Sequence, residues 1–512
     1  MFNSKFSNID DIDEWLVVEK IYKENEKRIS IIKNNLVEKY GFDEVLAEDS
    51  ILYELSLLVY KNHALFKGKR LFHFFLYYTI QFILFILSPL LFLHNLFQKK
   101  YSYSLLFEEM WDERSLYSRF YQQIDIHIKK NISSALFLTT PSLKKITDIN
   151  KIQGWESSII DSRNNNIFYN YKIVLKMIKS DYSFGFSLYK ASVNIDLLYL
   201  YIRILRRILM HSSQVNNIKA DIIISAVDYY WNPIKYYYYK KKINHVILTQ
   251  HNHKDNYLFG RALMYSDYYF AHSNDSIDKM SINQNATIKS IGSLQLVDFL
   301  GKKDESPKYD ILFINQTVND NLTLCSPLLN QSLLIKSHAI LIDNFYKYTN
   351  NHRDIKIAYM TKPTYMDIEP AKGVRKIFDN YNNIDFIEAY GQETFTLVNS
   401  AKLIINMYSS VGRESYGLDK RTLWINYNNC CDLFDLDIEN DDIHTLVTNT
   451  SYKAFEDRVD LLLSDNREVD EHYRKLKEKY MNIQGNPAKI VADEINKILE
   501  KKNENKNFGL YA

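Results

Sequence analysis

The chain has 512 residues, enough for roughly two or three domains with sizeable cores. Hydrophobic residues make up 46% and charged residues 25%, which excludes a largely disordered chain. The 64 Lys and Arg nearly balance the 62 Asp and Glu, and a net charge of +2 disfavours a dedicated nucleic-acid-binding protein. Three cysteines provide no disulfide framework, which fits a reducing, cytoplasmic setting.

Residues 1–132 are expected to form an N-terminal helical region. From Asp10 to Tyr60 the pattern is helical, with no Pro or Gly before Gly41, and the first residues lack a secretory signal. Segment 71–97 then contains no Asp, Glu, Lys or Arg. This is longer than the ~20 residues that a membrane-spanning helix needs, so the segment is a candidate for contact with a membrane.

We interpret 71–97 as a helix, or a helix pair bent at Ser88-Pro89, that lies in the cytoplasmic face of the cell membrane. Basic residues flank it on both sides, where they would reach lipid headgroups: Lys67, Lys69, Arg70, Lys99 and Lys100. The alternative is a buried pair of core helices. A complete span is disfavoured, because it would place a charged N-terminal head across the membrane without a signal.

From about position 133 onward, short apolar runs alternate with amphipathic stretches, which is typical of an α/β fold. Strands are expected at 135–139, 221–225, 245–249, 268–271 and 287–291, and helices at 167–178 and 188–209. After Ser306-Pro307 the pattern restarts, with strands expected at 310–314, 355–359, 384–387, 403–406 and 422–426. The sequence therefore predicts two similar halves, 133–305 and 306–450, and a polar helical tail at 451–512.

The second half contains a turn suited to a phosphorylated ligand. A strand at 403–406 runs into Tyr-Ser-Ser, and a helix is expected to begin near Arg413. Hydroxyls and free N–H groups at such a helix start can hold phosphate oxygens, and a Glu one turn later can accept hydrogen bonds from a ribose. The residues assigned to a nucleotide in this turn are Tyr408, Ser409, Ser410, Gly412 and Glu414. The alternative is an ordinary helix cap made by Ser410 and Glu414.

Residues 403–426 resemble the nucleotide-sugar half of GT-B glycosyltransferases, in which a Ser-Ser turn and a Glu-bearing helix precede a short strand. Further motifs in the same order resemble surface-polysaccharide transferases: Gln250-His251, Ser266-Asp267-Tyr268, Asn315-Gln316 and Thr361-Lys362-Pro363. Two positions depart from the family pattern. Asn406 stands where some retaining members have Glu, and Thr364 stands where relatives have His after the Lys-Pro pair.

The resemblance implies a GT-B-like α/β fold, in which two Rossmann-like domains face a cleft. It implies a glycosyltransferase that moves a sugar from a nucleotide-sugar donor to a cell-surface glycan or lipid-linked acceptor, with no metal and no further cofactor. Asn315, Gln316 and Lys362 would join the turn in holding the donor. Three alternatives stay open: a polyol-phosphate transferase of the teichoic-acid type, a nucleotide-sugar 2-epimerase, and a non-catalytic membrane-associated scaffold.

Two residues at neighbouring strand ends of the first half are candidates for the catalytic base. The first candidate is His251, because a histidine side chain can take a proton from an acceptor hydroxyl at physiological pH. Asp228 follows the preceding strand, and it either competes as the base or orients His251. His251 and His253 lack a third ligand at recognisable spacing, and the Asp-x-Asp pairs at 11–13 and 435–437 do not end strands, so no metal site is expected.

Overall fold

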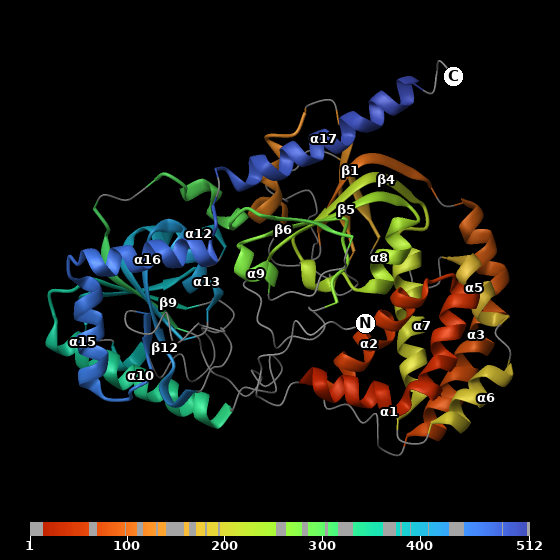
Figure 1. Ribbon diagram of the computed structural model, residues 1–512, viewed down its shortest axis with the longest axis horizontal. Helices are drawn as coiled ribbons and strands as arrows, with labels where there is room; N and C mark the ends of the chain where they lie inside the picture. Colours follow the sequence, from red (N-terminus) through yellow and green to blue (C-terminus); the bar gives the residue numbers. More distant parts are fainter. Residues whose placement is uncertain are drawn as a thin grey trace.

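The computed structural model describes residues 14–60, 69–97, 99–109, 116–129, 132–139, 158–162, 170–179, 182–192, 195–251, 263–278, 285–302, 306–315, 331–361, 375–378, 381–389, 391–407, 409–429, 445–483 and 485–508. These residues form a row of three bodies: an N-terminal helical layer, a first α/β sheet beside it, and a second α/β half on the other side (Figure 1).

The helical layer shares one apolar core. Its members are α1 (Glu14–Asn35), α2 (Glu44–Tyr60), α3 (Arg70–Phe97), α5 (Tyr171–Ile178), α6 (Tyr182–Ala191), α7 (Leu197–Gln214) and α8 (Pro233–Lys240). Helix α1 continues into η1 (Leu36–Tyr40) and ends at Gly41. Gly41 has a φ of 75° and donates its N–H to the carbonyl of Val37, a left-handed cap that glycine adopts without strain.

The first sheet has seven parallel strands in the order β3-β2-β1-β4-β5-β6-β7. Their bounds are β1 (Tyr101–Glu109), β2 (Ser134–Leu138), β3 (Ser158–Asp161), β4 (Ile218–Ser225), β5 (Ile243–Thr249), β6 (Tyr268–Ala271) and β7 (Thr287–Ser290). The β-branched run Ile222 to Ile224 in β4 is fully buried, as expected for a strand covered on both faces. Because every pair is parallel, the carboxyl ends of all seven strands meet at one edge.

The second sheet has six parallel strands in the order β10-β9-β8-β11-β12-β13. Their bounds are β8 (Tyr309–Asn315), β9 (Ile357–Thr361), β10 (Ile384–Glu388), β11 (Ala401–Asn406), β12 (Arg421–Ile425) and β13 (Leu446–Val447). The longer helices of this half are α10 (Gln331–Asn351), α12 (Gln392–Asn399), α15 (Tyr452–Leu463) and α16 (Arg467–Tyr480). The predicted fold class, two Rossmann-like α/β halves joined in one chain, is therefore confirmed.

Short helical segments connect the strands. They are η2 (Tyr117–Tyr121), α4 (Gln122–Asp125), η4 (Asp228–Tyr230), α9 (Asn274–Asp278), η6 (Leu294–Phe299), α13 (Ser410–Glu414), η9 (Ser415–Leu418) and η10 (Tyr427–Asn429). Many of them follow directly on the carboxyl end of a strand, which is where they contribute to the candidate site below.

The first half differs from the sequence prediction in three places. Its central strand β1 lies inside 1–132, where only helices were expected, and β3 was not expected at all. The expected helix at 188–209 is two helices, because Asp196 caps a new one by accepting a hydrogen bond from the N–H of Tyr199 (3.0 Å). Residues 167–169, the start of the other expected helix, lie outside the described residues.

The last helix does not stay with the second half. Helix α17 (Pro487–Phe508) crosses back and packs on the first sheet, so that Val491, Ile495 and Leu499 share a core with β1 and β4 (Figure 1). The predicted tail at 451–512 is therefore helical, but it is divided between the two halves.

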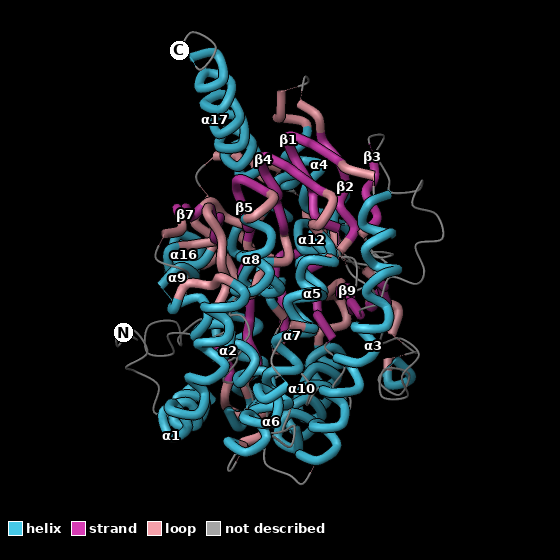
Figure 2. Tube along the Cα trace, turned by 90° about the vertical axis from the view of Figure 1, so that its right-hand side faces the viewer, coloured by secondary structure: helices cyan, strands magenta, loops and turns pink. Residues whose placement is uncertain are grey.

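Segment 71–97 belongs to one helix, α3, which is the first of the two expected forms and not the pair bent at Ser88-Pro89. It runs unbroken through Pro89, and the hydroxyl of Ser88 donates to the carbonyl of Phe85 (2.8 Å), the group that loses its helical N–H partner to proline. One face packs against α5, α6 and α7 at the outer edge of the molecule (Figure 2). Among the described residues it is the one helix long and apolar enough to cross a membrane, and 17% of its most apolar window is buried.

Candidate functional site at the junction of the two sheets

In both sheets the strand order reverses beside the first strand, between β1 and β4 and between β8 and β11. Parallel sheets of this kind bind ligands beyond the carboxyl ends of the strands at such a reversal. The Ser-Ser turn predicted to hold a nucleotide follows β11 and lies at this point of the second half.

The turn is held by its own side chains. The Oδ1 of Asn406 accepts a hydrogen bond from the N–H of Ser409 (3.0 Å), and the Oγ of Ser409 accepts one from the N–H of Val411 (3.4 Å). The cap of α13 is thus Ser409, and not Ser410 as in the alternative interpretation from sequence. Ser410 is the first residue of the helix and is partly exposed.

Gly412 has a packing role in the turn. A Cβ at this position would lie 2.6 Å from the Nδ2 of Asn406 and 2.7 Å from the ring of Trp424. With any other amino acid here, the side chain of Asn406 or the ring of Trp424 would have to shift. The sequence predicts that Gly412 is one of the residues that hold the nucleotide. Its close approach to Asn406 and Trp424 explains why the position needs glycine.

Glu414 points across to the first half. Its Oε1 accepts hydrogen bonds from the Oγ of Ser293 (2.7 Å) and from the Nε2 of Gln295 (3.0 Å), both on the segment after β7. Glu414 is 1% exposed, and this burial raises the pKa of its carboxyl to about 7, although the two hydrogen bonds and the charge of Arg119 act in the opposite direction. The sequence predicts that Glu414 accepts hydrogen bonds from a ribose, and it does not reveal the hydrogen bonds from Ser293 and Gln295.

The raised pKa makes stability depend on pH. A carboxyl whose folded pKa lies above its unfolded value stabilises the protein while it is protonated, and that stability is lost as the pH rises through about 7. Between pH 5 and pH 8 the wild-type protein is expected to lose about 2 kcal/mol of its free energy of unfolding through this carboxyl. Glu414→Gln should keep both hydrogen bonds and should not show this loss. Urea unfolding at the two pH values measures this, with the exposed Glu478→Gln as control. If the free energies of unfolding of wild type and Glu414→Gln differ by the same amount at both pH values, the pKa of Glu414 is not raised.

The first half contributes His251 and Asp228, which both follow strand ends as predicted. The Nδ1 of His251 lies 2.9 Å from the carbonyl oxygen of Ala226. Because a carbonyl only accepts, Nδ1 carries the proton, and the Nε2 of the neutral ring is the basic nitrogen. His251 is 2% exposed, and Phe120 packs against its ring at 5.0 Å between centroids.

Asp228 is buried beside a different partner. Its Oδ2 accepts a hydrogen bond from the hydroxyl of Tyr269 on β6 (2.8 Å), and its side chain is fully buried. A hydrogen bond to the main chain at Ala226 orients His251. The choice between His251 and Asp228 as the base stays a prediction.

Gln295 links the two halves. Its Nε2 donates to Glu414 of the second half and lies 3.5 Å from the carbonyl oxygen of His251, while its Oε1 accepts from the Nε of Arg119 (2.7 Å). Its side chain is 1% exposed. One amide side chain therefore spans the distance between the candidate base and the helix that carries the Ser-Ser turn.

The remaining predicted residues divide into two groups. Asn315 ends β8 beside β11, and its Oδ1 accepts a hydrogen bond from the Nε2 of His338 on α10 (2.9 Å). Burial lowers the pKa of His338 to about 4, so this imidazole is neutral at physiological pH. Gln316, Lys362 and Tyr408 lie outside the described residues, and their assignment to the donor stays a prediction.

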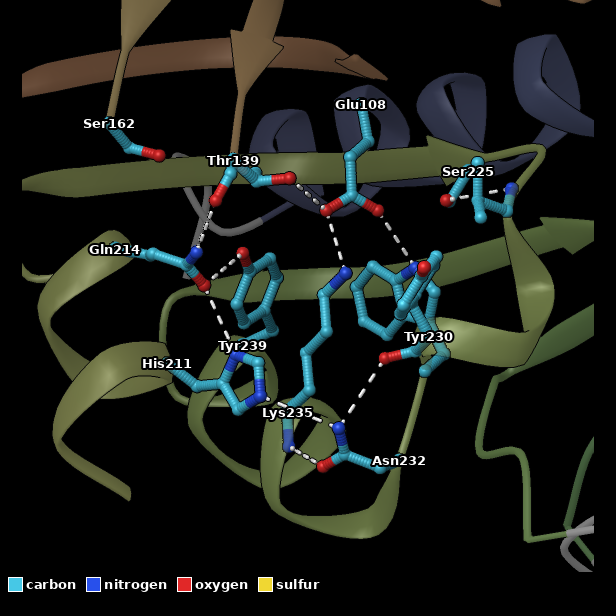
Figure 3. Close-up of polar contacts among 12 residues, drawn as sticks. Glu108, Thr139, Ser162, His211, Gln214, Ser225, Tyr230, Asn232, Lys235 and Tyr239 are labelled. Atoms are coloured by element: carbon cyan, nitrogen blue, oxygen red, sulfur yellow. Dashed lines mark hydrogen bonds and ion pairs between the residues drawn. The ribbon is translucent and has the colours of Figure 1, made fainter. Parts of the chain in front are cut away.

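A buried polar network that the sequence did not reveal lies at the carboxyl end of β1 (Figure 3). Glu108 is fully buried and forms an ion pair with the Nζ of Lys235 (2.7 Å). It also accepts hydrogen bonds from the Nε1 of Trp231 and the Oγ1 of Thr139, each at 2.9 Å. Burial lowers the pKa of Lys235, and the ion pair with Glu108 opposes that shift.

Within the described parts of the chain, no three His, Cys, Asp or Glu side chains lie together in a way that could hold a metal ion. The expectation that the reaction needs no metal is not tested by this observation and stays a prediction.

The fold and the site together define a two-domain α/β protein whose strand ends from both halves meet at one junction. No protein-family model matches the chain, and no curated protein sequence does. Among solved structures, the fold is similar to a wall teichoic acid polymerase TagF soaked with CDPG, with a TM-score of 0.49 and 14% identity over 84% of this chain and 98% of that one.

It is also similar to a UDP-GlcNAc 2-epimerase from Neisseria meningitidis bound to UDP-GlcNAc, with a TM-score of 0.45 and 11% identity over 78% of this chain and 100% of that one. At these identities we transfer neither substrate nor reaction from either protein.

Proposed function

We propose that the protein is a metal-independent glycosyltransferase that moves a sugar from a nucleotide-sugar donor to a cell-surface glycan or a lipid-linked acceptor. The observation that carries the proposal is the bridge made by Gln295. It brings the helix of the Ser-Ser turn in the second half to the imidazole-bearing strand end of the first half. A transfer reaction needs such a junction, because donor and acceptor must meet between the groups that hold them.

In this proposal the second half holds the nucleotide and the first half holds the acceptor. The Nε2 of His251 takes the proton of the acceptor hydroxyl as that oxygen attacks the sugar carbon. Ser409, Ser410 and Lys362 stabilise the charge that develops on the departing phosphate. No cofactor is required beyond the donor itself.

The proposal is tested by nucleotide binding to the purified protein. Thermal unfolding is measured with CDP, CMP, UDP and GDP compounds, since a ligand at 100 times its Kd stabilises by about 2.7 kcal/mol. A shift with CDP-glycerol alone would favour a polyol-phosphate transferase, and conversion of the sugar without any acceptor would favour an epimerase. The absence of any shift would favour a non-catalytic scaffold.

We also propose that α3 places the protein on the inner face of the cell membrane. On this helix polar side chains face the protein and large apolar side chains face outward, the opposite of the usual arrangement on a soluble protein. The polar His73 and Gln81 face inward, and His73 pairs with Asp196 (2.6 Å). Large apolar side chains face outward, including Phe72, Phe75, Phe82, Phe85 and Leu90, each about 60% exposed. This face is about 42 Å long, at 1.5 Å per residue.

Positive charge at the end of α3 supports the proposal that an anionic lipid surface covers the exposed apolar face of this helix. Asn95 of α3 accepts a hydrogen bond from Asn216 (2.8 Å), and the Nζ of Lys242 donates to the carbonyl of Asn216 (2.9 Å). Burial lowers the pKa of Lys242, and the positive charges of Lys219, Lys172 and Lys100 lower it further. Like charges gathered beside an apolar face match anionic headgroups beside acyl chains.

Replacing Phe82, Phe85 and Leu90 by Ser is expected to release a folded protein from the membrane. All three side chains are more than half exposed, so the change removes membrane contact without opening the core. Sedimentation with vesicles of anionic lipid in high salt measures the release, because apolar burial resists screening.

The control is Leu84→Ser on the opposite face, where Leu84 is fully buried. This control is expected to lower the thermal midpoint and to leave membrane binding in place. The proposal fails if the triple variant unfolds, or if wild-type protein stays in the supernatant.

A further inference from the structure

Arg413 lies on α13 between Gly412 and Glu414, and its side chain is 0% exposed. Its three guanidinium nitrogens, Nε, Nη1 and Nη2, are buried and have no hydrogen-bond partner among the described residues. Its nearest acidic contact is weak: Nη1 lies 3.9 Å from the Oδ2 of Asp275. The guanidinium carbon also lies 4.3 Å from the centre of the Tyr480 ring.

These contacts do not satisfy a guanidinium. The group has five N–H donors in a planar fork, and leaving buried donors unpaired destabilises a protein. A cation over an aromatic ring and a carboxylate at 3.9 Å provide attraction without hydrogen bonds. Glu414 directs its hydrogen-bonded oxygen to Ser293 and Gln295 instead. The donors of Arg413 therefore remain available to an anion.

Arg413 also lies where the two halves meet. Helix α13 follows the carboxyl end of β11, and α9, which carries Asp275, follows the carboxyl end of β6. The guanidinium thus reaches from the strand ends of one sheet to those of the other, four residues after the Ser409 cap. Ligands of parallel sheets bind along these strand ends.

We propose that Arg413 binds a phosphate or diphosphate group of the substrate at the junction and exchanges Asp275 for it. The planar fork matches phosphate oxygens with two parallel hydrogen bonds, which a lysine cannot make. The inference rests on the proposed function and deepens it, because Arg413 belongs to the helix that begins at the Ser-Ser turn. The same diphosphate chemistry occurs in a nucleotide and in a polyprenyl carrier, so the experiment separates the two.

The test compares Arg413→Met, Arg413→Lys and Asp275→Asn with wild-type protein by titration calorimetry. The probes are inorganic pyrophosphate, UDP, CDP and farnesyl diphosphate. We expect Arg413→Met to bind the diphosphate about 10- to 100-fold more weakly, and Arg413→Lys to lie between it and wild type. Asp275→Asn is expected to bind more tightly, because it removes the competing carboxylate.

Arg353→Met is the matched control. Arg353 also stacks on a tyrosine ring, 4.2 Å from the centre of Tyr381, but it is exposed and lies away from the junction. It should bind every probe as wild type does. Arg413→Met is also expected to be at least as stable as wild type in thermal unfolding, because it replaces an unpaired buried charge by an apolar side chain.

The outcomes separate this inference from the proposed function. Nucleotide binding that is equal in wild type and Arg413→Met, or unfolding of Arg413→Met, overturns the role of Arg413 and leaves the transferase standing. Binding of farnesyl diphosphate alone, dependent on Arg413, supports the anion site with a lipid carrier and contradicts the nucleotide donor. Failure of wild type to bind any of the probes overturns both.

Discussion

Replacing Lys235 by Met is expected to destabilise the protein by about 3 to 5 kcal/mol, the largest stability effect we predict for one side chain. Glu108 is fully buried at the end of the central strand, and the Nζ of Lys235, 2.7 Å away, is its only described ion-pair partner. Without Lys235 a carboxylate remains in the core with hydrogen bonds from Trp231 and Thr139 alone. The free energy of unfolding in urea measures the effect.

Two variants give this prediction its specificity. The double variant Lys235→Met with Glu108→Gln is expected to regain most of the lost stability, because no charge stays buried. The amide oxygen still accepts from the Nε1 of Trp231, and the amide NH2 group can donate to the hydroxyl of Thr139. Lys347→Met removes an exposed pair with Asp343 and is expected to change stability by less than about 0.5 kcal/mol. A loss for Lys235→Met no larger than for Lys347→Met would mean that Glu108 is protonated or solvated.

Replacing His251 by Asn is expected to lower the rate of sugar transfer by about 10²- to 10⁴-fold, the range typical of general-base catalysis. Donor affinity should change little, because a base acts in the transition state. The comparison of kcat with the Kd for the nucleotide therefore measures the role. The ring is held by the carbonyl of Ala226 at 2.9 Å, so the substitution removes the basic nitrogen without opening the strand end.

Asp228→Asn serves as the comparison for His251. Its carboxylate accepts from Tyr269 inside the first half, so we expect a smaller loss of turnover and some loss of stability. With His251 as the base, the acidic limb of the rate profile should lie at a higher pH than a carboxylate base would give. A larger loss for Asp228→Asn, with an acidic limb at lower pH, would move the base to Asp228.

The strands of both sheets were predictable where buried residues form short apolar runs. The predicted strand at 221–225 corresponds to β4, and the one at 403–406 to β11. Strand β1 was missed because it begins Tyr-Ser-Tyr-Ser and ends in two glutamates. Both glutamates are fully buried: Glu108 pairs with Lys235, and Glu109 accepts from the N–H groups of Leu116 and Tyr117. No local pattern shows that a charge will be compensated by a residue so far along the chain.

The candidate site was predictable in position and not in contacts. Strand ends of parallel sheets lie together, so His251 and Ser409 were expected at the junction. The partners of Glu414 were not, since Ser293 and Gln295 belong to the other half and look like ordinary turn residues in the sequence. Arg413 drew no attention beyond marking a helix start, because only the folded chain shows that its guanidinium lacks hydrogen bonds.

The return of α17 to the first sheet sets an order of events during synthesis. The core beneath β1 and β4 includes Val491 and Ile495, which the ribosome makes about 200 residues after the last strand of that sheet. At 5 to 20 residues per second, this delay is roughly 10 to 40 s. During that time η2 and α4 are the described segments that cover this apolar face of the nascent sheet, and the part that α17 later covers stays exposed. The N-terminal half therefore matures after the C-terminal one, and it is the half that we expect chaperones to hold.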